Sequence, residues 1–504
     1  MIADLWELQR MSMSDSTVSH SATAETPTRG VRSQGLVLAF LCIAGFMTFL
    51  DVSIVNVSLP TIERELEITE TTLQYVVTTY GTVLGGCLLL GGRLADSFGR
   101  RRILQGGLIL FALASLTAGL SQDVVLLVIA RGLQGLGAAF IAPAALSLLA
   151  NTFPEGPART RALGVWGGIS GVASVFGVML GGLLTEGPGW RWIFFINVPI
   201  GLAAAALAPV IVPESQDSTQ RRSFDVAGAA VLTAGLILLI FTLGQVVNWH
   251  WGSVKTVGAL AGVVILLSGF VMVERRSRTP LIPLSTFKQK VLRNANLTAV
   301  FMLGCLVTLF FFASLYMQQV LGYSPIRTGL AYLPIAVIVS VGAGISQGLV
   351  RKAAAKPVLI VGLVLAAIGM VLLWRLPVHA TYPADILPAS LVGGLGLGMA
   401  FVPIQVAAFA GVDSASSGLA AGLINTSQEA GGALGVAIAA SVAFSRIPGL
   451  TAWAGSNPVR IVQARADVFH EAFLIGAAFA ALGVLAALTL PMMRASEQAG
   501  TPVG

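Results

Sequence analysis

The chain has 504 residues, of which 55% are hydrophobic and only 11% are charged, and its formal net charge is +7. Soluble globular proteins carry about 25% charged residues, so a chain with this few cannot cover a water-facing surface and is expected to be an integral membrane protein. Its apolar runs are continuous and about 20 residues long, which is the length of a helix that crosses a bilayer and excludes a barrel of short alternating strands.

The first residues differ from the rest of the chain, because they are polar and rich in Ser and Thr. This composition predicts a disordered cytoplasmic tail over 1–34, in which Met11 and Met13 offer alternative starts. No signal peptide is expected, because the first apolar run is too long and is interrupted by Asp51.

Fourteen segments are predicted to be transmembrane helices, because each is apolar and long enough to cross the hydrocarbon core. They fall at 35–58, 71–91, 103–120, 124–148, 162–184, 193–212, 225–246, 254–273, 294–317, 327–350, 357–375, 385–408, 416–443 and 468–490. The segments at 327–350 and 416–443 also carry glycine and polar residues.

The fourteen segments group as six, two and six, which predicts an all-α membrane fold with two pseudo-symmetric halves, a common transporter architecture. The expected parts are a six-helix bundle at 35–212, a cytoplasmic linker at 213–224, two extra helices at 225–273, a basic cytoplasmic loop at 274–293, a second six-helix bundle at 294–490 and a cytoplasmic tail at 491–504.

The distribution of positive charge predicts the orientation of these helices. An even number of spans puts both termini on one side, and most of the 30 Lys and Arg residues then fall on that side. The largest cluster is formed by Arg275, Arg276, Arg278, Lys288, Lys290 and Arg293, whereas the first loop on the other side is acidic. Both termini are therefore expected in the cytoplasm.

The stretch GGRLADSFGRRR at 91–102 is predicted to be a cytoplasmic turn between the second and third helices. Within it, Gly92 would let a neighbouring helix come close, Asp96 could favour a helix N-terminus or pair with arginine, and Gly99 suits a tight turn. We expect Gly92, Asp96, Gly99 and Arg100 to form a latch that stabilises the outward-open state. The alternative is that the cluster only anchors the turn in the cytoplasm.

Asp51 and Arg131 lie deep within the first and fourth predicted helices. Each is about eight residues, or ~12 Å, from the outer end of its helix, so the two share a depth. A charge inside the membrane is costly and therefore marks a functional candidate. We predict that they pair and that a movable contact makes a proton switch, with a static packing pair as the alternative.

Glu429 is the third ionisable residue within a span, and no cation lies near it in the sequence. An isolated carboxyl group in that position could take up and release protons or bind a cationic substrate directly. The alternative is that it faces a wet cavity or a polar group of a neighbouring helix.

The fifth predicted helix is rich in glycine, including Gly171, Gly177, Gly181 and Gly182. Small residues let helices approach closely, slide or bend. The candidates for the wall of a substrate cavity are Tyr75, Tyr80, Gln134, Trp166, Asn197 and Glu429.

Enzyme and cofactor signatures are missing from the sequence. It contains no HExxH, no P-loop and no GxSxG, and its four histidines show no metal-ligand spacing. Cys42, Cys87 and Cys305 each lie in an apolar run, which suits buried thiols. We expect no enzyme, metal or cofactor, and without an ATP-binding motif in this chain any uphill transport would draw on an ion gradient or on a partner.

Several motifs together resemble the fourteen-helix drug:proton antiporters of the major facilitator superfamily. LDVSIVNVSLP is similar to the family's first-helix signature, and GGRLADSFGRRR matches the superfamily's loop motif. RGLQGLGAA matches the fourth-helix motif through Arg131, Gln134 and Gly135. The stretches at 190–201, 315–334 and 417–437 look like further family segments, and the likeness covers about residues 35 to 490.

The resemblance implies export of hydrophobic, often cationic, small molecules in exchange for protons, with Asp51 and Arg131 in proton coupling. It implies a monomer in a bacterial plasma membrane whose partners are a small-molecule substrate, protons and lipid, and not nucleic acid. Three alternatives stay open: a dedicated exporter of one endogenous metabolite, antibiotic or lipid, a non-transporting sensor or scaffold, and an intramembrane enzyme.

Two departures from the family pattern bear on these alternatives. Val178 stands where the fifth-helix motif usually has proline, and Arg351 stands where the second copy of the loop motif would have an acid. The missing proline removes the usual kink of that helix.

Overall fold

The computed structural model describes residues 34–68, 70–214, 225–277, 280, 282, 289–352, 354–377, 380–412, 416–445, 453 and 457–492. The predicted tails and most of the linker at 213–224 lie outside the described residues, and so does part of the loop at 274–293.

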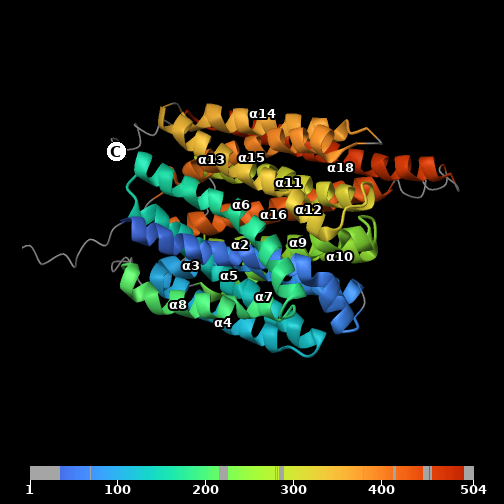
Figure 1. Cartoon of the computed structure of the whole chain (residues 1–504). Helices are drawn as coiled ribbons and strands as arrows, with labels where there is room; N and C mark the ends of the chain where they lie inside the picture. The colour runs from blue at the N-terminus through green and yellow to red at the C-terminus, as the bar shows by residue number, and fades with distance from the viewer. Residues whose placement is uncertain are drawn as a thin grey trace, which may run out of the picture.

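The first bundle is formed by seven helices (Figure 1). They are α2 (Gln34–Glu65), α3 (Glu70–Phe98), α4 (Arg100–Leu120), α5 (Val124–Thr152), α6 (Pro157–Glu186), the short α7 (Trp192–Phe195) and α8 (Asn197–Ile211). Helices α3 and α4 pack on α5, α2 packs on α6, and α8 packs on α4. Helix α5 therefore lies at the centre of this half.

The second bundle repeats this arrangement with the later helices. They are α11 (Lys290–Gln319), α12 (Pro325–Ala331), α13 (Leu333–Lys352), α14 (Ala355–Trp374), a π-helix (Tyr382–Ile386), α15 (Leu387–Phe409), α16 (Ser417–Ser445) and α18 (Pro458–Leu488). Helices α13 and α14 pack on α15, and α11 packs on both α16 and α18. The two bundles meet where α16 contacts α3 and where α13 contacts α6.

Two further helices, α9 (Val226–Trp249) and α10 (Val254–Arg276), join the bundles in sequence. Helix α9 packs against α3 of the first bundle and α16 of the second, and α10 packs on α9. The pair therefore lies beside the contact between the bundles (Figure 1).

Hydrogen bonds identify which helix ends lie together. The start of α2 meets the end of α5, because Gln34 Nε2 donates to the Thr152 carbonyl at 3.4 Å. The end of α18 meets the start of α14, because Lys356 Nζ donates to the Leu488 carbonyl at 2.6 Å. We call this side of the molecule, where α2 begins and α18 ends, the terminal end.

Every predicted segment corresponds to a long helix or to a helix in two pieces. Among the described residues, twelve helical segments are long and apolar enough to cross a membrane. Helices α6 and α16, which match the fifth and thirteenth predicted segments, are not among these twelve. The count of fourteen spans therefore stays a prediction.

Two predicted helices are interrupted by a single residue. The segment at 385–408 is continuous, because the π-helix runs directly into α15. The segments at 193–212 and 327–350 correspond to α7 with α8 and to α12 with α13, which are separated by Ile196 and by Tyr332. Pro199 and Pro334 lie within the first three residues of α8 and α13. Proline has no N–H to donate to the preceding turn, so the helical ladder is broken there.

Glycines bring α14 and α15 into backbone contact. A methyl group added to Gly362 of α14 would lie 2.7 Å from the carbonyl oxygen of Gly396 in α15. One added to Gly369 of α14 would collide with the backbone of Gly393. Lipid tails are as apolar as leucine, so close packing of this kind is a main source of helix association in membranes.

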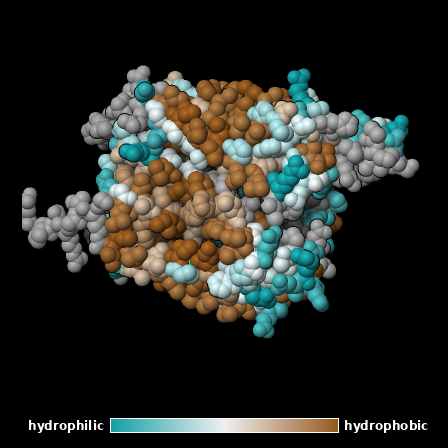
Figure 2. All heavy atoms as spheres, in the orientation of Figure 1, coloured by the Kyte–Doolittle hydropathy of each residue, from teal (hydrophilic) through white to brown (hydrophobic). Residues whose placement is uncertain are grey.

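The surface has separate apolar and hydrophilic regions, as expected for a membrane protein. Figure 2 shows apolar residues over the middle of the visible face and hydrophilic residues gathered toward its two ends. Helix α10 contributes large exposed apolar side chains, among them Val254, Val264 and Ile265. This apolar belt is consistent with a protein that crosses a membrane many times.

Candidate functional site

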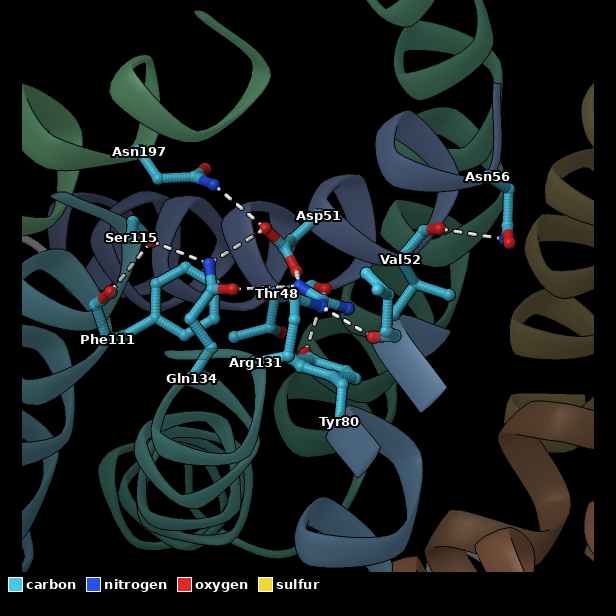
Figure 3. Close-up of polar contacts among 11 residues, drawn as sticks. Thr48, Asp51, Val52, Asn56, Tyr80, Phe111, Ser115, Arg131, Gln134 and Asn197 are labelled. Atoms are coloured by element: carbon cyan, nitrogen blue, oxygen red, sulfur yellow. Dashed lines mark hydrogen bonds and ion pairs between the residues drawn. The ribbon is translucent and has the colours of Figure 1, made fainter. Parts of the chain in front are cut away.

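Asp51 of α2 and Arg131 of α5 are in contact within the first bundle, as their equal depth predicts (Figure 3). The Asp51 Oδ2 atom accepts a hydrogen bond from Arg131 Nη1 at 2.5 Å. The side chain of Asp51 is fully buried, and that of Arg131 is 2% exposed. Two opposite charges withdrawn from water in this way must be paired with each other and with polar groups.

Neutral polar side chains complete the coordination of this pair (Figure 3). The Asp51 Oδ1 atom accepts hydrogen bonds from Gln134 Nε2 at 3.2 Å and from Asn197 Nδ2 at 3.0 Å. Arg131 Nη1 also donates to Gln134 Oε1 at 2.9 Å, and Arg131 Nε donates to the Val76 carbonyl at 3.1 Å. Gln134 therefore contacts both charges.

The network extends to α3 and α4. Gln134 Nε2 donates to Ser115 Oγ of α4 at 2.7 Å, and Ser115 in turn donates to the Phe111 carbonyl. The guanidinium carbon of Arg131 lies 4.3 Å from the ring centroid of Tyr80 of α3, which is cation–π geometry. Helices α2, α3, α4, α5 and α8 thus all contribute to one buried polar cluster.

Glycines allow the helices to come close enough to form this cluster. A methyl group on Gly135 would lie 2.5 Å from the Tyr80 carbonyl oxygen, so the fourth-helix motif needs glycine where α5 crosses α3. On the other side, methyl groups on Gly177 and Gly181 of α6 would lie 2.5 Å from Ser53 Cβ and 3.0 Å from the Ile54 carbonyl oxygen of α2.

The structure describes the surroundings of only some of the other residues singled out in the fifth predicted helix. Gly182 has open space around it, and the surroundings of Gly171 and Val178 lie outside the described residues. Helix α6 runs without a break from Pro157 to Glu186, through the position where the family motif has proline.

A second buried carboxylate, Asp96 of α3, joins the two bundles at the terminal end. Its Oδ1 accepts from the Gly418 backbone N–H at 2.9 Å, and its Oδ2 accepts from the Leu419 N–H at 2.8 Å. Both donors lie in the first turn of α16, where the helix dipole favours a negative charge. Arg100 Nη2 donates to the same carboxylate at 2.8 Å.

The stretch at 91–102 is not a loop, contrary to the sequence-based prediction. Helix α3 continues to Phe98 and α4 begins at Arg100, so that Gly99 alone separates them. Gly99 has a φ of 103°, which glycine adopts without strain. The i,i+4 pair of Asp96 and Arg100 spans this break and orders it.

Gly92 lies where α3 and α16 touch. A methyl group on Gly92 would collide with the Gly418 carbonyl oxygen and lie 3.2 Å from Gly422 Cα. The close helix approach expected for Gly92 is therefore present, and Gly92, Asp96, Gly99 and Arg100 form one contact region.

Other polar contacts join the bundles at the terminal end, and the sequence analysis does not predict them. Ser147 Oγ of α5 and Ser417 Oγ of α16 are 2.6 Å apart, and Asn151 Nδ2 donates to Ser417 Oγ at 2.8 Å. Gln347 Nε2 of α13 donates to the Arg161 carbonyl of α6 at 2.7 Å. A polar residue near the end of an apolar helix is the only signal that the sequence carries for these contacts.

Glu429 lies midway along α16, at the seam between the bundles. A methyl group on Gly85 of α3 would lie 3.3 Å from Glu429 Cβ, so the acid faces the first bundle. Its side chain is exposed. Tyr80, whose ring packs on Arg131, and Gly85, which faces Glu429, both lie on α3, so this helix contacts both the buried pair and the seam.

The structure separates the other cavity candidates. Tyr80, Gln134 and Asn197 belong to the buried Asp51 cluster and not to an exposed wall. Trp166 is only 4% exposed and packs against Gly45 of α2, whereas Tyr75 is exposed.

The part of the chain that the structure describes contains no cluster of metal-binding side chains and no disulfide. It contains no group of three or more His, Cys, Asp or Glu residues that could hold a metal ion. Cys42, Cys87 and Cys305 are free thiols, and the latter two are buried.

Comparisons with known proteins identify the family. A model described as Major Facilitator Superfamily matches residues 41–436. The chain is 36% identical over 451 residues to the puromycin resistance protein pur8 of Streptomyces alboniger, covering 89% of this chain and 88% of that protein. It is 36% identical over 440 residues to the cephamycin export protein CmcT of Amycolatopsis lactamdurans, covering 87% and 90%.

A third relative and a solved structure extend the comparison. The multidrug resistance protein Stp of Mycobacterium tuberculosis is 32% identical over 411 residues, covering 82% of this chain and 76% of that protein. The crystal structure of the human organic anion transporter MFSD10 superposes with a TM-score of 0.64 at 15% identity, covering 89% of this chain and 99% of that one. At this low sequence identity, the similarity to the MFSD10 structure shows a shared fold and nothing about substrate.

The contacts of Asp96 lead to a prediction about the terminal end. Asp96→Asn removes the charge that faces Arg100 and the α16 N-terminus, and hydrogen bonds to charged groups are worth about 1.5–3 kcal/mol. We expect the ratio of closed to open terminal ends to fall at least about tenfold, since 1.4 kcal/mol is a factor of ten in an equilibrium constant. A disulfide between Ser147→Cys and Ser417→Cys, in a background without native cysteines, would report closure.

The cross-linking yield should fall in Asp96→Asn and stay at the parent level in Arg102→Gln, which changes an arginine that is 59% exposed. Membrane expression should be unchanged in both variants. Equal cross-linking in the Asp96→Asn and parent proteins would contradict the latch.

Proposed function

Since the chain belongs to the Major Facilitator Superfamily, we propose that it is a proton-coupled antiporter that exports hydrophobic and cationic small molecules by alternating access between its two bundles. The observation that carries the proposal is the buried Asp51–Arg131 pair, held by polar side chains from neighbouring helices. The names of the relatives, which denote resistance and export, support the direction of transport.

Proton coupling follows from the chemistry of the pair. When Asp51 gains a proton, its attraction to Arg131 is lost, and Arg131 keeps hydrogen bonds to Gln134 and to the Val76 carbonyl. Because five helices meet at this cluster, a change in its contacts alters how α2 and α5 pack. Loss of the proton restores the pair and the original packing.

Contacts at the terminal end support alternating access. This end is closed by the hydrogen bonds of Asp96 to α16 and by the Ser147–Ser417 contact. If both termini are cytoplasmic, as the positive charges predict, the present conformation is closed on the cytoplasmic side. The latch must break when the cytoplasmic side opens to admit substrate. The protein then resides in a bacterial plasma membrane with small molecules, protons and lipid as its partners.

Glu429 supplies a negative charge at the seam, where a cation could bind between the bundles. Its side chain is exposed while Asp51 is fully buried, so substrate and coupling proton have separate carboxylates in this proposal. Helix α3 contacts both regions, because Tyr80 packs on Arg131 and Gly85 faces Glu429.

A second candidate is an exporter dedicated to one antibiotic or one endogenous product. The names of two relatives, a puromycin resistance protein and a cephamycin export protein, each refer to a single antibiotic and favour this reading. The name of the third relative refers to multidrug resistance. Both candidates use the same coupling site and differ in substrate breadth.

Asp51→Asn tests coupling. The amide can keep hydrogen bonds to Gln134 and Asn197 but cannot be protonated, so uptake driven by a pH gradient in inside-out vesicles should fall to background. Exchange of substrate for substrate without a gradient should persist. Removing one partner of a buried pair costs about 3–5 kcal/mol, so the amount of folded protein must be measured as well.

Glu186→Gln is the matched control, because Glu186 is exposed at the end of α6. It should behave like the parent protein in both assays. Gradient-driven uptake by a well-folded Asp51→Asn protein at the parent rate would exclude Asp51 from coupling.

Glu429→Gln tests cation binding. Loss of the charge should weaken transport of a permanent cation such as tetraphenylphosphonium at least about tenfold, since hydrogen-bonded or paired charges are worth 1.5–3 kcal/mol. Transport of a neutral substrate of similar size should be unaffected. A parallel loss for both substrates would mean that Glu429 is needed for folding or for the conformational change and not for charge selection.

Substrate breadth is tested by growth inhibition. Cells that express the protein should gain resistance to several unrelated hydrophobic compounds, whereas Asp51→Asn cells should not. Resistance confined to one compound class would favour the dedicated exporter.

A further inference from the structure

Helix α9 covers the seam between the bundles on the side of α3 and α16. One apolar cluster contains residues of all the helices concerned: Leu89 of α3, Ala229, Leu232 and Leu236 of α9, Phe270 of α10, and Leu419 and Leu423 of α16. Helix α9 therefore covers the line along which α3 meets α16.

Backbone contact holds α9 on α3. A methyl group on Gly86 would lie 3.0 Å from the backbone nitrogen of Ile237 and 3.1 Å from its Cα, and would collide with its side chain. Toward α16 the contact is different, because it is made by side chains: Leu243 and Val246 of α9 pack on Ala437. Side-chain contacts of this kind can slide, whereas the approach at Gly86 fixes α9 to the first bundle.

One side chain of α9 reaches the acid at the seam. A methyl group on Gly85 would collide with Ile240 Cδ1, and the same position is 3.3 Å from Glu429 Cβ. Ile240 and Glu429 therefore lie side by side against Gly85. Ile240 is 7% exposed, so it fills the space between the acid and the helix pair.

Helix α10 packs on α9 and carries large apolar side chains on its exposed surface. The α10 side chains Val254 and Ile265 are 90% and 70% exposed. The described part of the chain thus places Ile240 between Glu429 and the lipid-facing side of the helix pair.

We propose that α9 forms a lateral wall of the Glu429 site and that Ile240 is a specificity-determining residue, which limits the width of the apolar cation that fits beside the carboxylate. The proposal rests on the proposed function, in which Glu429 binds the cationic substrate. It gives the two extra helices a role: α9 lines the substrate site from the side, and α10 covers α9 on its outer side.

The size of residue 240 then decides which cations bind well. One methylene in an apolar pocket changes discrimination about 10–200-fold. Ile240→Ala should widen the site and favour bulky cations, whereas Ile240→Phe should narrow it and favour small ones. Ile265→Ala on α10 removes the same atoms from an exposed surface and is the matched control.

Equilibrium binding to the purified full-length protein tests this. The ratio of the dissociation constants for tetraphenylphosphonium and tetramethylammonium should fall about tenfold in Ile240→Ala, the lower end of that range, and rise in Ile240→Phe. Ile265→Ala should leave it unchanged. An unchanged ratio in both Ile240 variants, with thermal unfolding like that of the control, would overturn the proposal.

A labelling experiment separates this proposal from the function on which it rests. In a background without native cysteines, Glu429→Cys would be reacted with the lipid-soluble reagent N-phenylmaleimide in membranes. Adding Ile240→Ala should speed labelling about tenfold or more, and adding Ile265→Ala should not. An equal rate in both would exclude α9 as a wall, whereas faster labelling with parent-like cation binding in Glu429→Gln would keep the wall and reject Glu429 as the cation site.

Discussion

The ion pair between Asp51 and Arg131 is the interaction on which the first bundle depends. Two charges withdrawn from water inside a membrane protein are tolerated only when each meets the other and polar groups around it. Those groups come from α3, α4, α5 and α8, so the helices must pack in one register to supply them. In the proposed function, protonation of the carboxylate would weaken its contact with Arg131 and so release this constraint on packing.

Asp96 is a second buried carboxylate that must be paired, and its partners lie in both bundles. Its oxygens accept backbone N–H groups of α16, and Arg100 of its own half neutralises the charge. The buried carboxylate is satisfied only while α3 and α16 touch, and they touch because Gly92 and Gly418 have no side chains between them. Closure of the terminal end is therefore conditional on contacts from both halves, which suits a contact that breaks and forms in each transport cycle.

Much of the fold and part of the site could be predicted from the sequence. Apolar runs of bilayer length indicated where the helices lie, because their length is set by the hydrocarbon thickness. Asp51 and Arg131 stood out because charge is costly in lipid, and their equal depth was enough to pair them. The helix ends were less predictable. Gly99 alone separates α3 from α4, and two other segments are divided next to a proline, because local hydrogen bonding decides whether a helix continues.

The sequence by itself determined that this is a helical membrane protein with charges buried at matching depths, because hydropathy and helical rise act along the chain. Only the tertiary structure decided which neutral polar groups form hydrogen bonds with those charges. Gln134 and Asn197 come from two helices to the same oxygen of Asp51, and Ser115 of a third helix binds Gln134. Nothing in the sequence of these three residues indicates that they meet. The position of α9 was likewise undetermined, since an apolar helix can pack on lipid or on protein, and only the glycines of α3 select the seam beside Glu429.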